Sequence, residues 1–153
     1  MTTRHISKGQ VLQSKGELNS RIYKVQSGLL RSYTLDGKGK MHIYMFGPEG
    51  WVVADPQPPQ VPCELYIDAL EDTTVQVLEK DISRELENIP ELLKHIATLQ
   101  KRIIMLMSAS ALERYQYFTN TYPQMVQRVP QWMIASYLGI TPETLSTVKN
   151  KVR

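Results

Sequence analysis

The pattern of hydrophobic and polar positions changes character once along the chain, near residue 80. From residue 6 to about residue 80, short segments of β-branched, aromatic and aliphatic residues alternate with glycine-containing turns. The DGKG run at 36–39 supplies glycines that can take the positive φ of a tight hairpin turn. These segments predict an all-β unit with strands in QVLQ, RIYKVQ, LLRSYTL, KMHIYMF, ELYIDAL and TTVQVLEK.

One segment of the β unit has no regular pattern. The stretch ADPQPPQVPC places four prolines between positions 56 and 62. Proline lacks a backbone N–H and therefore cannot continue a helix or an interior strand. The sequence predicts an irregular loop here.

Beyond residue 88 the hydrophobic spacing is helical, from Ile89 to Met107, which predicts a long helix that begins near Pro90. Its apolar residues form two stripes, and a small all-β body offers little helical surface to cover both. We therefore expect one stripe to be a homodimer seam and the other to pack on the β body. The alternative is one helix buried on most sides within a single domain. The predicted seam has coiled-coil spacing and consists of Leu92, Ile96, Leu99, Ile103 and Leu106; the second stripe consists of Ile89, Leu93, Ala97, Ile104 and Met107.

Two further helical features follow the long helix. Ser110 and Glu113 have the spacing of a capping box, which predicts a break at 108–110 and a new helix that ends before the Tyr122-Pro123 pair. Residues 131–150 fit the twenty-residue helix-turn-helix pattern, with small Ala135 at the helix contact and Gly139 in the turn. The apolar contacts in this pattern are Ile134, Leu138, Ile140, Leu145 and Val148. The alternative is a helical hairpin that only packs.

Charge is unevenly distributed along the 153 residues, whose net charge is +3. Residues 1–88 contain ten Lys/Arg and twelve Asp/Glu, a net −2, whereas residues 89–153 contain eight and three, a net +5. A basic C-terminal part suits a surface that faces nucleic acid, although a few surplus lysines on a solvated helix would give the same count. Charge alone does not decide between them.

Composition narrows the classes of protein to which the chain can belong. No apolar run approaches the roughly 20 residues that span a bilayer, and the single cysteine, Cys63, favours a reducing, cytoplasmic location. His5, His42 and His95 are too scattered for a metal site, and no cofactor is expected. No nucleophile–base trio or carboxylate pair is apparent, so an enzyme is not expected.

The segments KGQVLQSKGE, IYKVQSGLLRSY, ALEDTTVQVLEK and ERYQYFTNTYPQMVQRVPQWMIASYLGITPETLS together resemble the Crp/Fnr family of transcription regulators, in a branch with a short C-terminal region. The resemblance covers nearly the whole chain. It implies an α+β protein with a cyclic-nucleotide-binding-like β-roll of jelly-roll type over 1–88, a dimerisation helix and hinge over 89–109, and a helix-turn-helix unit over 110–153. It also implies a homodimer that binds double-stranded DNA in the major groove.

Two departures from the family concern the effector. Members that bind cyclic nucleotides carry a Gly-Glu pair and, at the end of the phosphate loop, an Arg followed by Ser or Thr. The matching positions here are Ala54-Asp55 and Cys63-Glu64. Without the arginine, a cyclic phosphate beside these carboxylates would be uncompensated charge. The chain is therefore not expected to respond to cyclic AMP. These four positions mark the expected effector pocket, and the β-roll either binds a small molecule other than a cyclic nucleotide or has no ligand.

A third departure lies in the predicted recognition helix, where Thr147 replaces the arginine that commonly follows Leu-Ser in this branch. Thr141, Glu143, Ser146 and Thr147 are expected to face the groove, and Lys149, Lys151 and Arg153 to neutralise phosphates. The sequence thus predicts a dimeric DNA-binding regulator. One alternative is a β-roll ligand-binding or protein-interaction module that has lost DNA binding. Another, an enzyme of the cupin-like β-barrel class, would need a metal or catalytic cluster.

Overall fold

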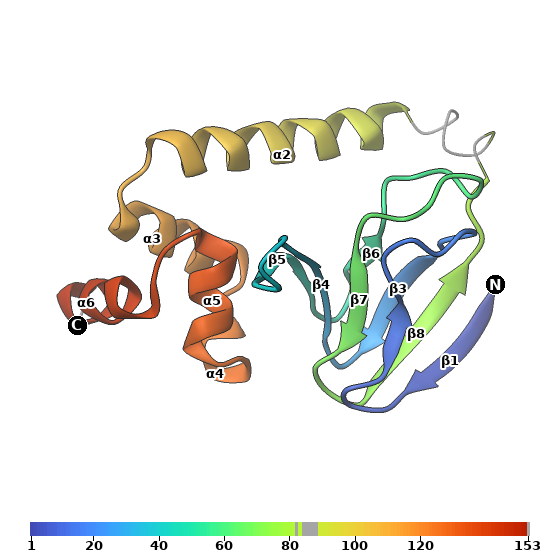
Figure 1. The fold of residues 1–153 in the computed structure, drawn as a ribbon, viewed down its shortest axis with the longest axis horizontal. Helices are drawn as coiled ribbons and strands as arrows, with labels where there is room; N and C mark the ends of the chain where they lie inside the picture. Colours follow the sequence, from blue (N-terminus) through green and yellow to red (C-terminus); the bar gives the residue numbers. More distant parts are fainter. Residues whose placement is uncertain (82, 84–88, 153) are drawn as a thin grey trace. The chain divides into compact units, whose positions relative to one another are not determined.

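Strands make up the N-terminal part of the chain and helices the C-terminal part (Figure 1). The structure, a computed structural model, describes residues 1–81, 83 and 89–152. The chain divides into two units, Met1–Ser83 and Arg84–Arg153. The expected α+β class is confirmed. The three-part division at residues 88 and 109 stays a prediction, and residues 84–88 lie outside the described part.

The first unit contains two four-stranded antiparallel sheets, with strand orders β1-β8-β3-β6 and β2-β7-β4-β5. The strands are β1 (Thr2–Ile6), β2 (Val11–Gln13), β3 (Ile22–Ser27), β4 (Leu30–Leu35), β5 (Met41–Gly47), β6 (Val52–Ala54), β7 (Tyr66–Ala69) and β8 (Thr73–Leu78). All six predicted strands are confirmed, as is the irregular loop at 56–62.

The sequence pattern missed β1 and β6. Four of the five residues of β1 are exposed, so the strand has no alternation of buried and exposed positions to detect. Only three residues form β6, which is too short for a periodic signal. Both strands owe their conformation to pairing with neighbours distant in sequence, β1 with β8 and β6 with β3.

Side chains of both sheets form the core of the first unit. The buried cluster consists of Ile6, Tyr23, Val25, Leu30, Val53, Ile67, Ala69, Val75 and Val77. A glycine is required between β3 and β4, because Gly28 has φ 87° and an added Cβ would lie 2.5 Å from the carbonyl oxygen of Asp72. The predicted hairpin joins β4 and β5, and the Asp36 carboxylate accepts the backbone N–H groups of Lys38 and Lys40 at its turn.

The second unit is helical, with α2 (Ile89–Ser108), α3 (Ala111–Thr121), α4 (Met125–Arg128), α5 (Gln131–Leu138) and α6 (Pro142–Val152). The long helix and its end at residue 108 are confirmed. So is the capping box, in which Ser110 Oγ accepts from the Glu113 N–H and the Glu113 carboxylate accepts from the Ser110 N–H. The sequence missed α4, a four-residue turn between two prolines.

Aromatic side chains contribute to the core of the second unit. Phe118, Tyr122 and Tyr137 pack together, with ring centroids 5.5 to 5.6 Å apart and the Tyr137 ring edge-on to the other two. This geometry is favoured by the aromatic quadrupole. The cluster ties α3 to α5.

Candidate functional site

The turn between α5 and α6 has the geometry that the sequence predicts. Gly139 has φ 63°, its N–H donates to Ser136 O at 3.2 Å, and the Ile140 N–H donates to Ala135 O at 3.1 Å. These bonds satisfy the last carbonyls of α5 and direct the chain into α6. The predicted contact residues are confirmed as packing residues: Ile134, Ala135, Leu138, Leu145 and Val148 are at most 6% exposed, and Ile140 is half-buried.

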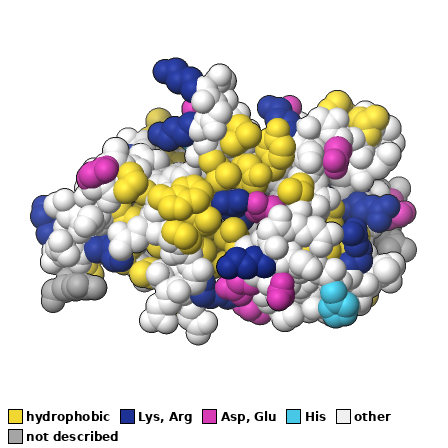
Figure 2. Space-filling model, turned by 60° about the horizontal axis from the view of Figure 1, so that its bottom comes forward, with side chains coloured by type: hydrophobic (Ala, Val, Ile, Leu, Met, Phe, Trp, Pro, Cys, Tyr) yellow, Lys and Arg dark blue, Asp and Glu magenta, His cyan; other side chains and the backbone are white. Residues whose placement is uncertain are grey.

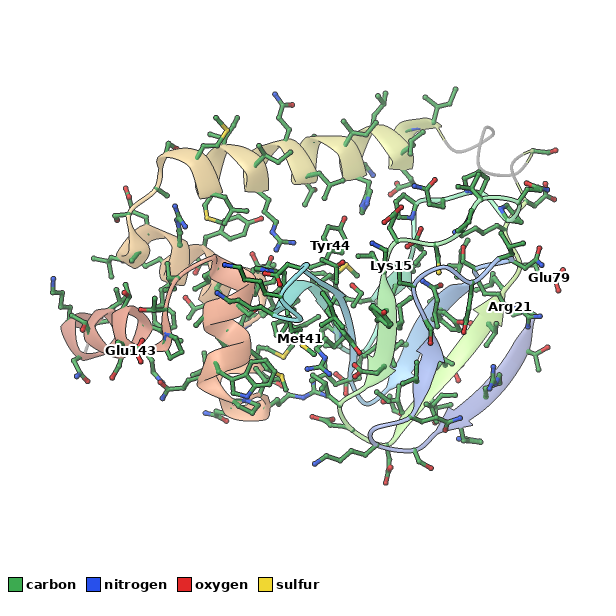
Figure 3. All side chains as sticks on the ribbon, viewed as in Figure 1. Lys15, Arg21, Met41, Tyr44, Glu79 and Glu143 are labelled. Carbon is green, nitrogen blue, oxygen red and sulfur yellow. The ribbon has the colours of Figure 1, made fainter. Side chains whose placement is uncertain are left out.

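The outer face of α6 is polar and exposed. Thr141 caps the helix, because its hydroxyl oxygen accepts the Thr144 N–H at 3.1 Å. Thr147 donates its hydroxyl to Glu143 O one turn earlier, at 3.1 Å. The side chains of Glu143, labelled in Figure 3, and Ser146 make no hydrogen bond or ion pair within the described part of the chain. Two of the four predicted base-reading side chains, those of Glu143 and Ser146, therefore have no hydrogen-bond or ion-pair partner in the described part of the chain.

Basic residues lie in the last turn of α6. Lys149 is half-buried and Lys151 is exposed. Both lie beyond the threonines, toward the helix C-terminus, where cations are favoured by the helix dipole. The third predicted phosphate contact, Arg153, lies outside the described residues.

Arg114 holds the ends of two helices together. Its guanidinium donates to Leu106 O at 2.7 Å and Ala109 O at 3.1 Å, at the end of α2, and to Leu138 O at 3.1 Å, at the end of α5. Helix C-termini leave carbonyls without intrahelical partners, and a guanidinium carries five donors in a planar fork. Arg114 thus fixes the turn that precedes α6 to the junction between α2 and α3. Sequence reasoning missed it because its partners lie up to 24 residues away.

A second arginine reinforces this connection. The Arg102 guanidinium lies 4.0 Å from the centroid of the Tyr137 ring and donates to Tyr137 O at 3.4 Å. A cation over an aromatic face is attracted by the ring quadrupole. Arg102 therefore adds a contact between α2 and α5.

The predicted dimer seam is largely exposed on α2. Leu92, Ile96 and Ile103 are 50%, 51% and 57% exposed, while Leu99 and Leu106 are half-buried. In the second stripe, Leu93, Ile104 and Met107 are 59%, 54% and 81% exposed. Hydrophobic side chains also reach the surface elsewhere (Figure 2, yellow), so exposure alone does not define an interface. The packing of the second stripe on the β-roll stays a prediction.

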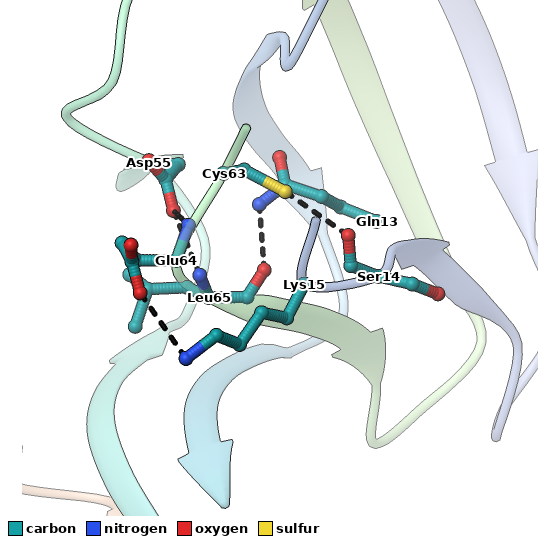
Figure 4. Close-up of polar contacts among 7 residues, drawn as sticks. All are labelled: Gln13, Ser14, Lys15, Asp55, Cys63, Glu64 and Leu65. Carbon is teal, nitrogen blue, oxygen red and sulfur yellow. Dashed lines mark hydrogen bonds and ion pairs between the residues drawn. The ribbon is translucent and has the colours of Figure 1, made fainter. Parts of the chain in front are cut away.

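The predicted effector residues lie at the loop that joins β6 to β7, and Figure 4 shows three of them, Asp55, Cys63 and Glu64. Ala54 ends β6 and is half-buried. The Asp55 side chain is 1% exposed, and its carboxylate accepts the N–H groups of Gln57 at 2.9 Å and of Glu64 and Leu65 at 2.8 Å each. The negative charge of Asp55 is thus compensated by backbone N–H groups of the loop itself.

Cys63 and Glu64 have different surroundings. Cys63 is 1% exposed and donates its thiol to Ser14 O, and burial raises the pKa of this thiol. A raised pKa reduces the thiolate fraction, which is the reactive form. The Glu64 carboxylate is exposed and pairs with Lys15 at 3.2 Å. Neither side chain has the cationic character that would hold a phosphate.

A hollow of about 350 Å³ lies beside the same loop. Arg21 and Glu79, both labelled in Figure 3, are among the residues that line it. Its full lining is Asn19, Ser20, Arg21, Pro59, Glu79 and Lys80. None of the four predicted effector residues belongs to this lining.

The described residues contain no group of three or more His, Cys, Asp or Glu side chains that could hold a metal ion. None of the helices in the described part is long and apolar enough to cross a membrane.

No protein-family model matches the chain. Curated proteins do. An anaerobic regulatory protein of Haemophilus influenzae is 28% identical over an alignment 161 positions long, which takes in 92% of this chain and 63% of that protein. The nitrogen fixation regulation protein FixK of Rhizobium meliloti is 25% identical over 95% of this chain and 72% of that protein. This chain thus spans less than two thirds of the Haemophilus relative.

Solved structures show the same fold. FixK2 of Bradyrhizobium japonicum superposes with a TM-score of 0.83 over 99% of this chain and 83% of that chain, at 20% identity. A Thermus thermophilus transcriptional regulator of the CRP/FNR family gives a TM-score of 0.73 over 99% of this chain and 85% of that chain, at 17% identity. The fold is therefore that of CRP/FNR regulators. The chain is thus similar in sequence to these regulatory proteins and shares the fold of CRP/FNR regulators, which is the resemblance that its motifs predict.

Proposed function

We propose that this chain acts as a dimeric, DNA-binding transcription regulator of the Crp/Fnr type that works in the cytoplasm. The observation that carries the proposal is that α6 has one buried, apolar side and one exposed, polar side. Leu145 and Val148 bury one side of the helix against its own unit, whereas the opposite side presents polar side chains to solvent. A helix held in this way by a preceding helix and a tight turn can enter the major groove of DNA.

Phosphate contacts should dominate the affinity. Thr141 and Thr147 already have hydrogen-bond partners in their own helix, which leaves Glu143 and Ser146 as the direct readers. Glutamate can accept a hydrogen bond from cytosine N4, and serine can contact several bases. Lys149, Lys151 and Arg153 would supply the phosphate contacts.

A salt series tests DNA binding directly. Titration of the chain onto DNA fragments selected from a random-sequence pool should show affinity that falls as salt rises. Replacing all three basic residues with Gln removes six phosphate contacts per dimer and should flatten the slope of log affinity against log salt by roughly 5, at about 0.9 per contact. As a matched control, Lys8, Lys24 and Lys38, all exposed in the β-roll, are changed to Gln together and should leave the slope unchanged.

The competing function is a β-roll module without DNA binding. The hydrogen bond of Thr147 to its own helix favours it, because the residue that replaces the family's arginine offers no free donor. Absence of any salt-dependent association, even at low ionic strength, would establish this alternative.

Dimerisation through α2 is proposed from the exposed seam. Ile103→Lys places a charge among Leu99, Ile96 and Leu106, and should shift sedimentation from dimer to monomer. Thr98→Lys adds the same charge to an exposed position outside both stripes and should leave the dimer intact. An unchanged dimer in the Ile103 variant would rule out this interface.

We also propose that cyclic AMP is not the effector. Position 63 carries a buried thiol in place of an arginine, and the Asp55 carboxylate is directed at the backbone of its own loop. No side chain among Ala54, Asp55, Cys63 and Glu64 supplies the positive charge that a cyclic phosphate requires.

A further inference from the structure

The loop from 56 to 65 has few backbone donors, and nearly all are engaged. Four of its ten residues are prolines, which leaves six N–H groups. Three of these bind the Asp55 carboxylate. The Val61 N–H donates to Pro58 O and the Cys63 N–H to Glu17 O. The remaining donor belongs to Gln60, which is exposed.

The Asp55 carboxylate occupies a site built for an anion. Oδ2 accepts two adjacent N–H groups, those of Glu64 and Leu65, and Oδ1 accepts that of Gln57. Successive N–H groups that converge on one point form a concavity that binds anions. Here the anion belongs to the chain, and it enters the concavity from the residue that begins the loop.

Lys80 secures the same loop through its carbonyls. Its ammonium group donates to Asp55 O at 2.5 Å, Gln57 O at 2.6 Å and Ser20 Oγ at 2.7 Å. An ammonium carries three donors, and each has an acceptor here. The loop is therefore bound by an anion at its N–H groups and by a cation at its carbonyls, and both charges come from the chain.

We infer that the 55–65 loop is an anion-binding site whose permanent occupant is the side chain of Asp55. The loop is closed without an added ligand, so the β-roll has a single state in place of a ligand-free and a ligand-bound one. The inference goes beyond DNA binding and does not depend on it, because the loop is tested in the absence of DNA.

Removal of the internal anion should create a site for an external one. Asp55→Ala in the full chain leaves a void of carboxylate size lined by three N–H donors, and its thermal unfolding midpoint should fall. Formate has the size and charge of the missing group. With a Kd of about 10 mM, 0.1 M formate would raise the ratio of folded to unfolded variant about tenfold, whereas wild type should not respond. Acetate and inorganic phosphate, which are larger, should do less.

Asp36→Ala is the matched control. Asp36 also accepts two backbone N–H groups, but it lies in an exposed hairpin where water can replace the carboxylate. Its stability should not depend on formate when compared with chloride at equal ionic strength. If formate stabilises the Asp55 variant no more than chloride does, the anion site is absent and the inference fails.

Two measurements on wild type do not rely on a folded variant. The amide protons of Gln57, Glu64 and Leu65 should be protected from hydrogen exchange with no ligand present, and exchange at unstructured rates would overturn the inference. Cyclic AMP and formate should leave the unfolding midpoint unchanged. A rise at low micromolar cyclic AMP would show that the loop accepts an external anion after all. Loss of DNA binding would leave all these outcomes unaffected.

Discussion

The 55–65 loop and helix α6 carry polar groups of similar kinds but direct them oppositely. In the loop, the Asp55 carboxylate and the Lys80 ammonium group bind backbone groups of their own unit. On α6, Glu143, Ser146 and Lys151 are exposed to solvent. The loop has almost no backbone N–H left for a ligand, whereas α6 has side chains with no partner in the described part of the chain.

This difference in burial and in hydrogen-bond partners distinguishes polar groups that stabilise the fold from polar groups that can bind a ligand. A buried polar group must be satisfied within the protein, because its desolvation costs about 1–3 kcal/mol when it has no partner. An exposed polar group is satisfied by water and can exchange that water for DNA at little cost. The comparison supports the proposal that α6 is the recognition surface and that the polar groups of the 55–65 loop have a structural role.

The largest expected effect is on the free energy of unfolding, after removal of the Arg114 hydrogen bonds that hold the turn before α6. Arg114→Met keeps the apolar stem but removes hydrogen bonds to Leu106, Ala109 and Leu138. Hydrogen bonds to a charged group contribute about 1.5–3 kcal/mol each and are not additive, so the free energy of unfolding should fall by about 3 kcal/mol. Urea denaturation measures this loss.

Lys101→Met is the control for that variant, since Lys101 is an exposed cation on α2. It should change the free energy of unfolding by no more than about 0.5 kcal/mol. Equal losses of stability in the two variants would mean that the Arg114 hydrogen bonds do not stabilise the helix ends. Arg114 would then not fix the turn that precedes α6.

A smaller effect is expected on DNA affinity when a base-reading side chain is added to the exposed face of α6. Thr147→Arg removes the hydroxyl that bonds to Glu143 O and adds a guanidinium to the exposed face. If that group reaches guanine O6 and N7, DNA binding should tighten by about 1–3 kcal/mol and gain preference at one base pair per half-site. Asn150→Arg would add the same charge at an exposed position of α6 outside the predicted base-reading residues, as a control. Equal tightening on every DNA sequence would indicate a phosphate contact and no base readout.

The sequence predicted the features that depend on neighbouring residues. Gly139, Ala135 and Leu145 could be placed because the sterics of a helix, a turn and a second helix constrain closely spaced positions. The capping box was predicted for the same reason, since Ser110 and Glu113 are three residues apart.

Features that depend on distant residues could not be predicted. The backbone partners of Asp55 could not be predicted, because two of its three donors lie nine and ten residues away, across a loop without a repeating pattern. The partners of Lys80 lie 23 to 60 residues away. The roles of these charges, and the pairing of β1 with β8, became visible only in the folded chain.

The smallest effect concerns the junction between α2 and α3, where Glu113 turns its carboxylate back to the Ser110 N–H. This hydrogen bond holds the pKa of the Glu113 carboxyl below its usual range. Because the pKa is lower in the folded state, the resulting stability is present above the ordinary carboxyl pKa and is lost as pH falls through the folded pKa. Glu113→Ala should therefore be less stable than wild type near pH 7, and the difference should shrink between about pH 5 and pH 3.

Glu113→Gln provides the control, because an amide oxygen can accept the same hydrogen bond but does not titrate. Its stability relative to Glu113→Ala should stay constant over that pH range, as measured by urea denaturation at each pH. Ser110→Ala should lower the free energy of unfolding by about 1 kcal/mol through loss of the other half of the box. A difference between wild type and Glu113→Ala that does not change with pH would mean that the carboxylate contributes no charge-dependent stability at this junction. The box would then act through geometry alone, as the neutral Ser110 hydroxyl does.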